Sequence, residues 1–384
     1  MSVHELALQR NKYKHLSDDE WRWFLQQVEG RERTADKLPT FATIPDWWYP
    51  VRLSCEQCSS ELTAKYKASL LSTFNFPYGV SRSEELSTLL DLTAGYGVDT
   101  YFLSEQFEHS DYVEQNPELC RIAAHNFADK PISIHNTTAE TFLASAGQYD
   151  LIFLDPARRD SHGGKVFRLE DCTPNVVELL PELLKHGKRL LLKLSPMLDI
   201  TQATKELSSI NWDIHVVAIK NEVKEILLLS GGNGTITCID LSKPERAFVF
   251  TREQEKDATV NYPYGDSRSE ELSTVNYLYE PSASILKAGA YKLIAQRFGL
   301  QKLDINTHLY ASDALIKNFP GRVWKITNDK LQITNANIVC RNYPLTPEQL
   351  KKKLHLRDGG TDFVIACRVA GKPTLFFAER ANIE

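Results

Sequence analysis

The chain reads Leu-Leu-Asp-Leu-Thr-Ala-Gly-Tyr-Gly from residue 89 to residue 97, and two segments of similar design follow it. They are Ser-Asp-Tyr-Val-Glu-Gln-Asn at 110–116 and Tyr-Asp-Leu-Ile-Phe-Leu-Asp-Pro at 149–156. Each is a short apolar run that ends in a polar residue, which predicts a buried strand of an α/β sheet. Because ligands of such sheets bind at the carboxyl ends of the strands, we expect the three ends to face one crevice.

The turn after the first strand contains Gly95 and Gly97 and leads into a helical segment, 98–107. Glycine lets the backbone turn sharply and approach a ligand, because no Cβ stands in the way. Glu114 ends the next strand about 20 residues further on, where an acidic residue binds both hydroxyls of a ribose. Strand, glycine turn, helix, strand and terminal acid, in that order, predict a nucleoside site.

Two phosphate-binding patterns are missing from the sequence. The dinucleotide fingerprint needs a third glycine at the position of Thr100, and a triphosphate loop needs Gly-Lys-Ser/Thr, which does not occur in the chain. A ligand that contains adenosine without phosphates therefore fits the pattern best, and S-adenosylmethionine is such a ligand.

At these residues the sequence resembles the class I S-adenosylmethionine-dependent methyltransferases. The segment with Asp91, Thr93, Gly95 and Gly97 matches the first motif of that family, and the resemblance implies that it holds the methionine end of the cofactor. Glu114 matches the acid that binds the ribose.

The resemblance extends to two further positions. The loop 136–140 occupies the place of the adenine contact; a carboxylate is common there, whereas this chain offers Asn136, Thr137 and Thr138, and we take Thr138 as the cofactor contact. Asp155-Pro156 resembles the start of the catalytic motif of amino-group methyltransferases, Asp/Asn-Pro-Pro-aromatic.

The resemblance makes Asp155 and Pro156 the candidate catalytic residues. The Asp155 carboxylate and the Pro156 carbonyl would each accept an N–H of an exocyclic amine and direct its lone pair at the methyl group. Ala157 and Arg158 replace the second proline and the aromatic residue of the motif. The alternative is that Asp155 only forms a turn at the end of a strand.

Arg158 and Arg159 follow the motif directly and are candidate substrate-binding residues. They suit capture of a phosphate beside the reacting group. They could equally lie in a solvated loop and pair with Glu170 and Asp171, and the sequence does not decide between these interpretations.

Composition is that of an ordinary globular protein, with 384 residues, 42% hydrophobic residues and a net charge of −5. No apolar run is long enough to cross a membrane and the N-terminus has no signal-like segment, so we expect a cytoplasmic protein with reduced cysteines. Cys55-Glu-Gln-Cys58 has no second cysteine or histidine pair at metal spacing, and no metal site is predicted.

Basic residues gather in the last segment of the chain. Residues 317–384 contain 12 Lys and Arg but 6 Asp and Glu, a net charge of +6 that leaves −11 for the rest. Lys351, Lys352 and Lys353 form its densest point, and they face either RNA phosphates or solvent only. The segments Phe319–Arg322, Ala336–Ile338, Arg341–Pro344 and Asp358–Gly360 resemble the THUMP-like domain found fused to methyltransferases. THUMP domains bind RNA, so the resemblance implies a tRNA or rRNA partner.

We therefore predict an α/β protein in four parts: a helical N-terminal region at 1–74, a Rossmann-like methyltransferase sheet at 75–251, a small α+β, ferredoxin-like segment at 262–316 and a THUMP-like domain at 317–384. Residues 252–261 are the expected linker and Ser284–Arg297 one expected helix. Residues 75–89 and 261–275 are nearly identical, for which we have no physical account.

The function expected from these features is S-adenosylmethionine-dependent methylation of a base amine in RNA. Two alternatives stay open at this point: a non-catalytic RNA-binding protein on a degenerate methyltransferase fold, and methylation of a protein or a small molecule.

Overall fold

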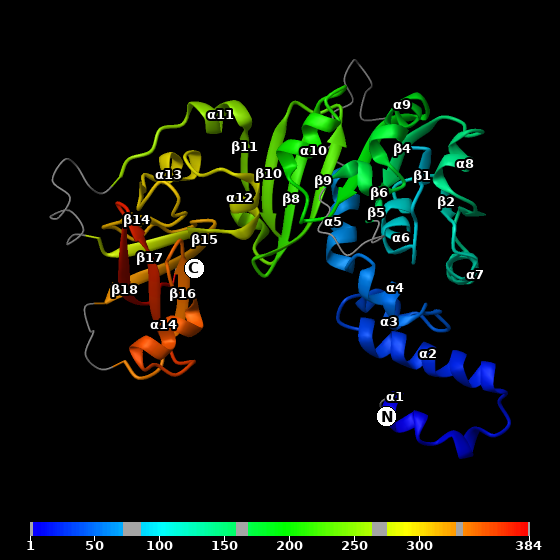
Figure 1. Ribbon diagram of the computed structural model, residues 1–384. Coiled ribbons are helices and arrows are strands. Elements are labelled where there is room, and N and C mark those ends of the chain that lie inside the picture. Colours follow the sequence, from blue (N-terminus) through cyan, green and yellow to red (C-terminus); the bar gives the residue numbers. More distant parts are fainter. Residues whose placement is uncertain (1–2, 72–85, 159–167, 263–274, 328–332, 383–384) are drawn as a thin grey trace. The chain divides into compact units, whose positions relative to one another are not determined.

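The computed structural model describes residues 3–71, 86–158, 168–262, 275–327 and 333–382 (Figure 1). The chain divides into two compact units, Met1–Trp212 with Leu227–Gly232, and Asp213–Ile226 with Asn233–Glu384. Most of the duplicated peptide, 75–85 and 263–274, lies outside the described residues. The predicted class is confirmed: a helical N-terminal region, an α/β sheet and an α+β C-terminal module.

Unit 1 begins with helices, as the sequence predicts. They are α1 (Val3–Ala7), α2 (Asp18–Thr34), α3 (Pro39–Thr43), α4 (Arg52–Gln57) and α5 (Glu61–Leu71), with a 3₁₀ turn at Arg10–Tyr13. Helix α2 starts at a capping box, in which the Ser17 side chain accepts from the Glu20 N–H and the Glu20 carboxylate accepts from the Ser17 N–H. Helix α5 packs against α6 (Val98–Ser104), so the helical region is attached to the sheet that follows.

The strands of unit 1 belong to a parallel sheet. Within the described residues its order is β7-β4-β1-β2-β3, with β1 between β2 and β4. The strands are β1 (Thr88–Asp91), β2 (His109–Glu114), β3 (Ile132–Asn136), β4 (Tyr149–Leu154) and β7 (Gly187–Leu194). Leu89, Ile152 and Leu191 are completely buried, as expected for parallel strands that are covered on both faces.

Helices alternate with these strands and complete the α/β pattern. They are α6, α7 (Pro117–Asn126), α8 (Ala139–Leu143), α9 (Val176–His186) and α10 (Ile200–Glu206). Helix α6 packs on β1 and β2, and α9 packs on β7. A short antiparallel pair, β5 (Ala157–Arg158) with β6 (Cys172–Thr173), follows the end of β4, and a 3₁₀ turn at Leu169–Asp171 precedes β6.

An aromatic cluster joins the helical region to the glycine turn. Phe41 and Trp47 lie 4.2 Å apart between ring centroids, and both are buried. The Trp47 indole N–H donates to the Tyr96 hydroxyl at 2.7 Å, and Tyr96 stands between the two glycines of the turn. Trp47 and Tyr49 are buried, so their rings pack in the interior of the protein. Trp48 is partly exposed and stacks on His125.

Four strands continue the chain after α10. They are β8 (Trp212–Ile219), β9 (Glu222–Ser230), β10 (Thr235–Asp240) and β11 (Phe248–Thr251), with a 3₁₀ turn at Pro244–Arg246. Trp212 and the second half of β9, from Leu227, belong to unit 1, and the rest of these strands belongs to unit 2. Lys220 and Asn221 join β8 to β9 with positive φ at both residues, the pattern of a type I′ hairpin turn. Strand β10 pairs with β8 in parallel and with β11 in antiparallel.

The rest of unit 2 is a second sheet with few helices. Within the described residues its order is β13-β14-β12-β15-β18-β17-β16. The strands are β12 (Tyr277–Pro281), β13 (Gln301–Lys302), β14 (Tyr310–Ser312), β15 (Gly321–Thr327), β16 (Asn337–Arg341), β17 (Asp362–Val369) and β18 (Lys372–Arg380). Helix α14 (Pro347–Leu354) packs on β16, and Leu350 supplies its buried contact.

The segment expected as a linker, 252–261, begins with helix α11 (Arg252–Asp257), because Thr251 and Gln254 form a capping box at its start. One sequence expectation in this region was wrong. The single helix expected at Ser284–Arg297 is two, α12 (Ala283–Ala288) and α13 (Leu293–Phe298). Gly289 ends α12 in the left-handed conformation, with φ of 81°, so the chain turns before α13.

The carboxyl end of β1 buries an acidic side chain. Asp91 is 0% exposed; its Oδ2 accepts from the Thr100 hydroxyl at 2.6 Å and its Oδ1 from the Thr93 N–H at 3.2 Å. Burial, helped by the nearby Asp99 and Asp155, raises the pKa of Asp91 to about 7. In the folded protein this carboxyl therefore holds a proton over a pH range in which the unfolded chain has lost it.

We predict that Asp91→Asn becomes more stable relative to the parent as pH rises. A raised folded pKa stabilises the parent fully below the ordinary Asp value of 3.8, and that stabilisation is lost as pH rises toward about 7. Asn is neutral throughout; its amide oxygen can accept from the Thr93 N–H, and its N–H₂ can donate to the Thr100 hydroxyl oxygen. Between pH 5 and pH 8 the stability difference should move in favour of Asn by on the order of 3 kcal/mol, measured by thermal and urea unfolding.

Asp150, at the amino end of β4, is the matched control. Burial raises its pKa, but the Lys188 ammonium and the N–H groups of Ser87 and Thr88 outweigh burial and leave the pKa below the ordinary value. Asp150→Asn should therefore cost the same stability at pH 5 and at pH 8. A pH-independent difference between Asp91→Asn and the parent would show that Asp91 is ionised throughout this range.

Candidate functional site

Parallel pairing brings the predicted site residues to one edge of the unit 1 sheet. Asp91 at the end of β1 lies in register with Tyr112 of β2 and with Phe153 of β4. Leu154, the last residue of β4, is opposite Leu192 of β7. The residues that follow these positions therefore emerge side by side, as expected for the ligand-binding edge of an α/β sheet.

The glycine turn between β1 and α6 has the backbone that the sequence predicts. Gly95 and Gly97 have φ of 57° and 82°, in the left-handed region. A Cβ on Gly97 would stand 2.6 Å from the Phe127 ring, so packing excludes any side chain there. A Cβ on Gly95 would meet open space, with the Thr93 carbonyl oxygen at 3.9 Å as its nearest contact.

Glu114 connects the end of β2 to this turn. One carboxylate oxygen accepts from the Gly95 N–H at 3.0 Å, and the other accepts from the Asn116 N–H at 2.8 Å. A carboxylate has about four lone-pair positions, so two remain for other donors. Tyr112 adds a hydrogen bond from its hydroxyl to the Gly95 carbonyl, and the turn is held from both sides.

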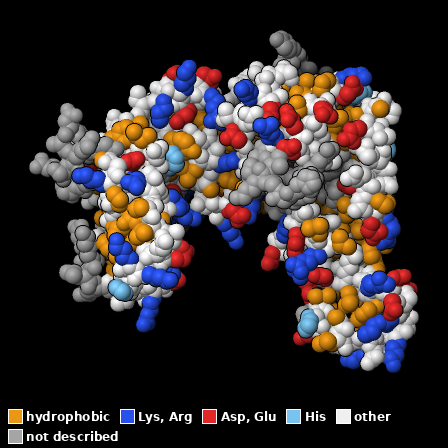
Figure 2. Space-filling view, in the orientation of Figure 1, with side chains coloured by type: hydrophobic (Ala, Val, Ile, Leu, Met, Phe, Trp, Pro, Cys, Tyr) orange, Lys and Arg blue, Asp and Glu red, His pale blue; other side chains and the backbone are white. Residues whose placement is uncertain are grey.

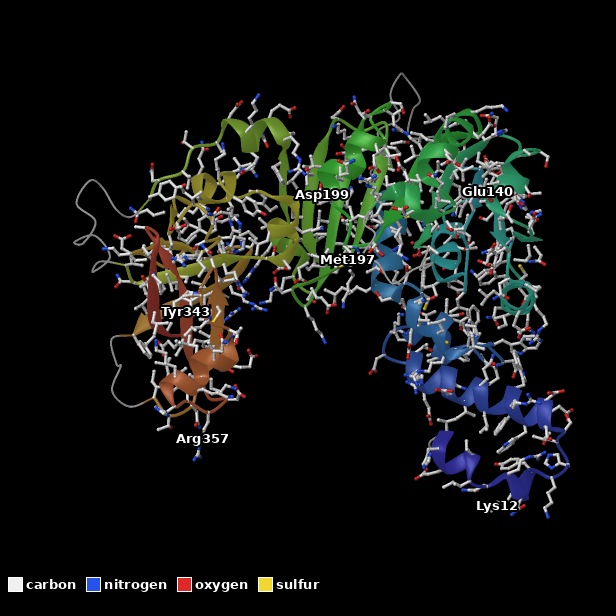
Figure 3. The ribbon with its side chains drawn as sticks, viewed as in Figure 1. Lys12, Glu140, Met197, Asp199, Tyr343 and Arg357 are labelled. Atoms are coloured by element: carbon white, nitrogen blue, oxygen red, sulfur yellow. The ribbon has the colours of Figure 1, made fainter. Side chains whose placement is uncertain are left out.

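The predicted adenine-contact loop follows β3. The Asn136 side-chain N–H₂ donates to the carbonyls of Glu114 and Gln115, at 2.9 and 3.1 Å, so this amide fixes the loop after Glu114. Thr138 is exposed and caps α8, with its hydroxyl oxygen accepting from the Thr141 N–H at 3.2 Å. Glu140, labelled in Figure 3, lies in the first turn of α8 and is exposed.

Asp155 and Pro156 directly follow β4. The Asp155 N–H donates to the Thr93 hydroxyl at 2.6 Å, which ties this position to the segment between β1 and the glycines. The Asp155 side chain is 36% exposed, whereas Pro156 is buried. Oδ2 of Asp155 accepts from the Lys193 ammonium of β7.

The segment after β7 lies at the same edge. Met197 is 54% exposed there, and Asp199 caps α10 by accepting from the Gln202 N–H at 2.8 Å (Figure 3). Met197 thus presents an apolar side chain beside the polar strand ends.

The sequence analysis missed a group of charged side chains next to Asp155, at the carboxyl ends of the strands. Asp99 of α6 is 7% exposed and Lys67 of α5 is fully buried, with 3.1 Å between the Lys67 Nζ and the Asp99 Oδ1. The Ser59 hydroxyl donates to Asp99 at 2.6 Å, and the Lys193 Nζ lies 3.7 Å from the Asp99 Oδ2. A charge left here without its partner would cost roughly 3–5 kcal/mol.

The effect of these lysines on Asp99 is clear in direction. Burial would raise the pKa of Asp99, but the ammonium groups of Lys67 and Lys193 outweigh burial and leave it below the ordinary value. Asp99 is therefore ionised and paired. One signal of this network stood in the sequence: Lys193 interrupts the apolar run Leu190–Leu194 of a buried strand.

The remaining predicted site residues lie elsewhere or are not described. The Arg158 backbone belongs to β5, and Arg159 lies outside the described residues. Lys351, Lys352 and Lys353 lie in unit 2 on the last turn of α14. On the visible face of the molecule, Lys and Arg side chains are scattered with Asp and Glu among them (Figure 2). Lys351 pairs with Asp358, whereas Lys352 and Lys353 are exposed.

The Cys55 and Cys58 thiols are unsuited to ionisation. Burial raises the pKa of both, that of Cys55 to about 12. In the part of the chain that the structure describes, no group of three or more His, Cys, Asp and Glu side chains is placed to hold a metal ion. Among the described helices none is long and apolar enough to cross a membrane.

The profile of a ferredoxin-like domain matches residues 277–320, and the profile of a THUMP domain-like family matches residues 319–380. No protein in a curated set is significantly similar to the chain.

Solved structures add similarity over nearly the whole chain. The crystal structure of a putative methyltransferase from Porphyromonas gingivalis W83 is 31% identical, covers 96% of this chain and 92% of that chain, and gives a TM-score of 0.80. An rRNA methylase from Streptococcus thermophilus is 10% identical over 44% of this chain and 93% of that chain, with a TM-score of 0.32. The plantazolicin methyltransferase BpumL in complex with SAH is 17% identical over 38% and 52%, with a TM-score of 0.28.

The last two similarities are too low to carry an inference about this chain. The first, with the match at residues 319–380, is sufficient: the chain belongs to the methyltransferase family that carries a C-terminal THUMP-like domain.

Proposed function

We propose that the protein is a cytoplasmic S-adenosylmethionine-dependent methyltransferase that acts on a base amine of RNA. The observation that carries the proposal is the meeting of the glycine turn, Glu114 and Asp155 at one edge of the parallel sheet. It supports a nucleoside donor and an N–H-bearing acceptor side by side.

The chain's own residues fit the cofactor. The open space at Gly95 leaves room for a ligand against the backbone, and the free lone pairs of Glu114 suit two ribose hydroxyls. Asp91 and Thr93 support the turn at the methionine end, and Thr138 lies in the loop proposed for adenine. When bound, S-adenosylmethionine supplies an electrophilic methyl group on sulfur.

Asp155 and Pro156 would orient the acceptor. An exocyclic base amine is a weak nucleophile because its lone pair is delocalised into the ring, so positioning supplies most of the rate. The half-exposed Asp155 carboxylate can accept one N–H and the Pro156 carbonyl the other. We further propose that Arg158 and Arg159 bind an RNA phosphate near the base.

The RNA partner, a tRNA or rRNA, rests on the THUMP-like match and on the basic C-terminal segment. The four-part division at 1–74, 75–251, 262–316 and 317–384 is likewise our proposal. It gives cofactor binding to the sheet and RNA docking to the last part.

Mass spectrometry of RNA nucleosides tests the function as a whole. Cells that lack the protein should lose one methylated nucleoside, which the parent gene restores and an Asp155→Ala gene does not. Identical nucleosides with and without the protein would overturn RNA methylation. RNA binding in the same cells would then favour the non-catalytic alternative, which the replaced residues Ala157 and Arg158 motivate.

We predict that Glu114→Ala weakens cofactor binding. A carboxylate that takes two hydroxyls makes charge-assisted hydrogen bonds, so its loss should cost about 1.5–3 kcal/mol. Calorimetric titration with S-adenosylhomocysteine measures this. Glu118→Ala is the control, because Glu118 lies on α7 and pairs with Arg121 at 2.7 Å. Equal affinity of Glu114→Ala and the control would remove Glu114 from the site.

Asp155→Ala should leave cofactor affinity near that of the parent and lower turnover, because its proposed partner is the substrate amine. Steady-state methylation of RNA from cells that lack the protein gives turnover, and S-adenosylhomocysteine titration gives affinity. Parallel loss of both quantities would assign Asp155 to the turn with Thr93. Parental turnover would end its role with the amine.

Replacing Lys352 and Lys353 by Gln should weaken RNA binding whatever the RNA sequence. Each lost phosphate contact should reduce the log–log salt slope by roughly 0.7 for a single strand. Lys351→Gln is the matched comparison: its ammonium already pairs with Asp358, so its effect on binding should be smaller. Filter binding over a salt series measures both, and parental slopes in the double variant would make this run a solvated helix face.

A further inference from the structure

Asp155 is joined to the N-terminal helices by a line of charged side chains that no motif predicts. Three consecutive ion pairs make up this line: Asp155 with Lys193, Lys193 with Asp99, and Asp99 with Lys67. The Ser59 hydroxyl also donates a hydrogen bond to Asp99. Of the four charged side chains in this line, Asp155 is the most exposed, at 36%, and Lys67 is fully buried. The line thus begins at the proposed acceptor site and ends inside α5.

We propose that Lys193 is the positioning residue for Asp155, and that Lys67 and Ser59 of the N-terminal region hold Lys193 in place through Asp99. This proposal rests on the proposed function, because it assigns Lys193 a part in placing the acceptor amine. It makes the helical N-terminal region a component of the acceptor site.

The geometry of the strands supports a specific pairing. Leu154 of β4 is opposite Leu192 of β7, so the next residues on the two strands, Asp155 and Lys193, are neighbours at the sheet edge. Lys193 binds Oδ2 of Asp155, and its side chain is 13% exposed. Among the described residues no hydrogen bond to Oδ1 of Asp155 occurs, which leaves that oxygen for an N–H of the acceptor.

The Asp99 carboxylate helps to hold the Lys193 ammonium beside Asp155. Asp99 has its own partners in Lys67 and Ser59, and its Oδ2 lies 3.7 Å from the Lys193 Nζ. An ammonium between two carboxylates is attracted to both, in a site where water screens little. Lys193 thereby limits the rotation of the Asp155 carboxylate.

Methyl transfer to the amine depends on a fixed orientation of the Asp155 carboxylate. The amine lone pair forms the N–C bond, the C–S electron pair leaves with sulfur, and one N–H proton passes to water through the Asp155 carboxylate that holds it. The nitrogen must point at the methyl carbon along the C–S axis. A misplacement of about 1 Å can cost on the order of a hundredfold in rate.

A second Lys–Asp pair on the same two strands serves as the control. The Lys188 ammonium lies 2.7 Å from Oδ1 of Asp150 at the opposite end of β7 and β4, and Lys188 is 64% exposed. Lys188→Met removes a strand-to-strand ion pair without touching the sheet edge that binds ligands.

A double-mutant cycle on the full-length protein tests the proposal. Lys193→Met, Asp155→Asn and their combination are compared with the parent in methylation of RNA from cells that lack the protein, with S-adenosylhomocysteine affinity and thermal unfolding measured in parallel. Lys193→Met should lower kcat roughly ten- to a hundredfold with cofactor affinity within about twofold. In the Asp155→Asn background it should cost nothing more, because the group it positions is already changed.

Lys193→Arg keeps a cation between the two carboxylates, so it tests the proposal even if Lys193→Met fails to fold. It should fold like the parent and show a kcat between those of the parent and Lys193→Met, whereas Lys188→Met keeps the parental kcat. Parental kcat in Lys193→Met, or losses that add to those of Asp155→Asn, would overturn the role of Lys193 alone. A parent protein that transfers no methyl group to this RNA would overturn the proposed function and, with it, this role.

Discussion

The parallel pairing of β1 between β2 and β4 is the constraint on which the unit 1 site depends. Because the three strands run in the same direction and in register, Asp91, Glu114 and Asp155 reach one edge of the sheet. Backbone hydrogen bonds then refine the arrangement: Glu114 holds the glycine turn, and Thr93 holds the first residue after β4. A shift of one residue in any of the three strands would turn its side chains to the other face of the sheet.

The same edge brings three acidic side chains close together, Asp91, Asp99 and Asp155. Two of them are buried, and their pKa values shift in opposite directions. The hydrogen-bond donors to Asp91 are neutral and its pKa is raised, whereas Asp99 faces two ammonium groups and its pKa is lowered. Similar burial thus leads to opposite protonation, because the neighbours differ.

The sequence was informative where the signal is local. Apolar runs, glycines with positive φ and the acid at the end of β2 lie close together in the chain, and each predicted strand of unit 1 has its counterpart in the structure. The Lys67–Asp99–Lys193 group was not predictable in the same way, since its members come from α5, α6 and β7 and only folding brings them together. The break between α12 and α13 was missed because a single glycine inside a helical pattern is compatible with a continuous helix, and only the structure shows that Gly289 is in the left-handed conformation that ends α12.

The pairing of Lys67 with Asp99 affects when the N-terminal helices can pack during synthesis of the chain. Ser59 precedes Asp99 by 40 residues, and Asp155 precedes Lys193 by 38. Until Asp99 has been synthesised, Lys67 lacks this carboxylate, and Phe41 and Trp47 lack the ring of Tyr96. The N-terminal helices therefore leave the exit tunnel before the sheet but complete their packing only after Tyr96 and Asp99 have followed. During that interval the nascent chain carries exposed aromatic surface, the kind of surface that general chaperones bind.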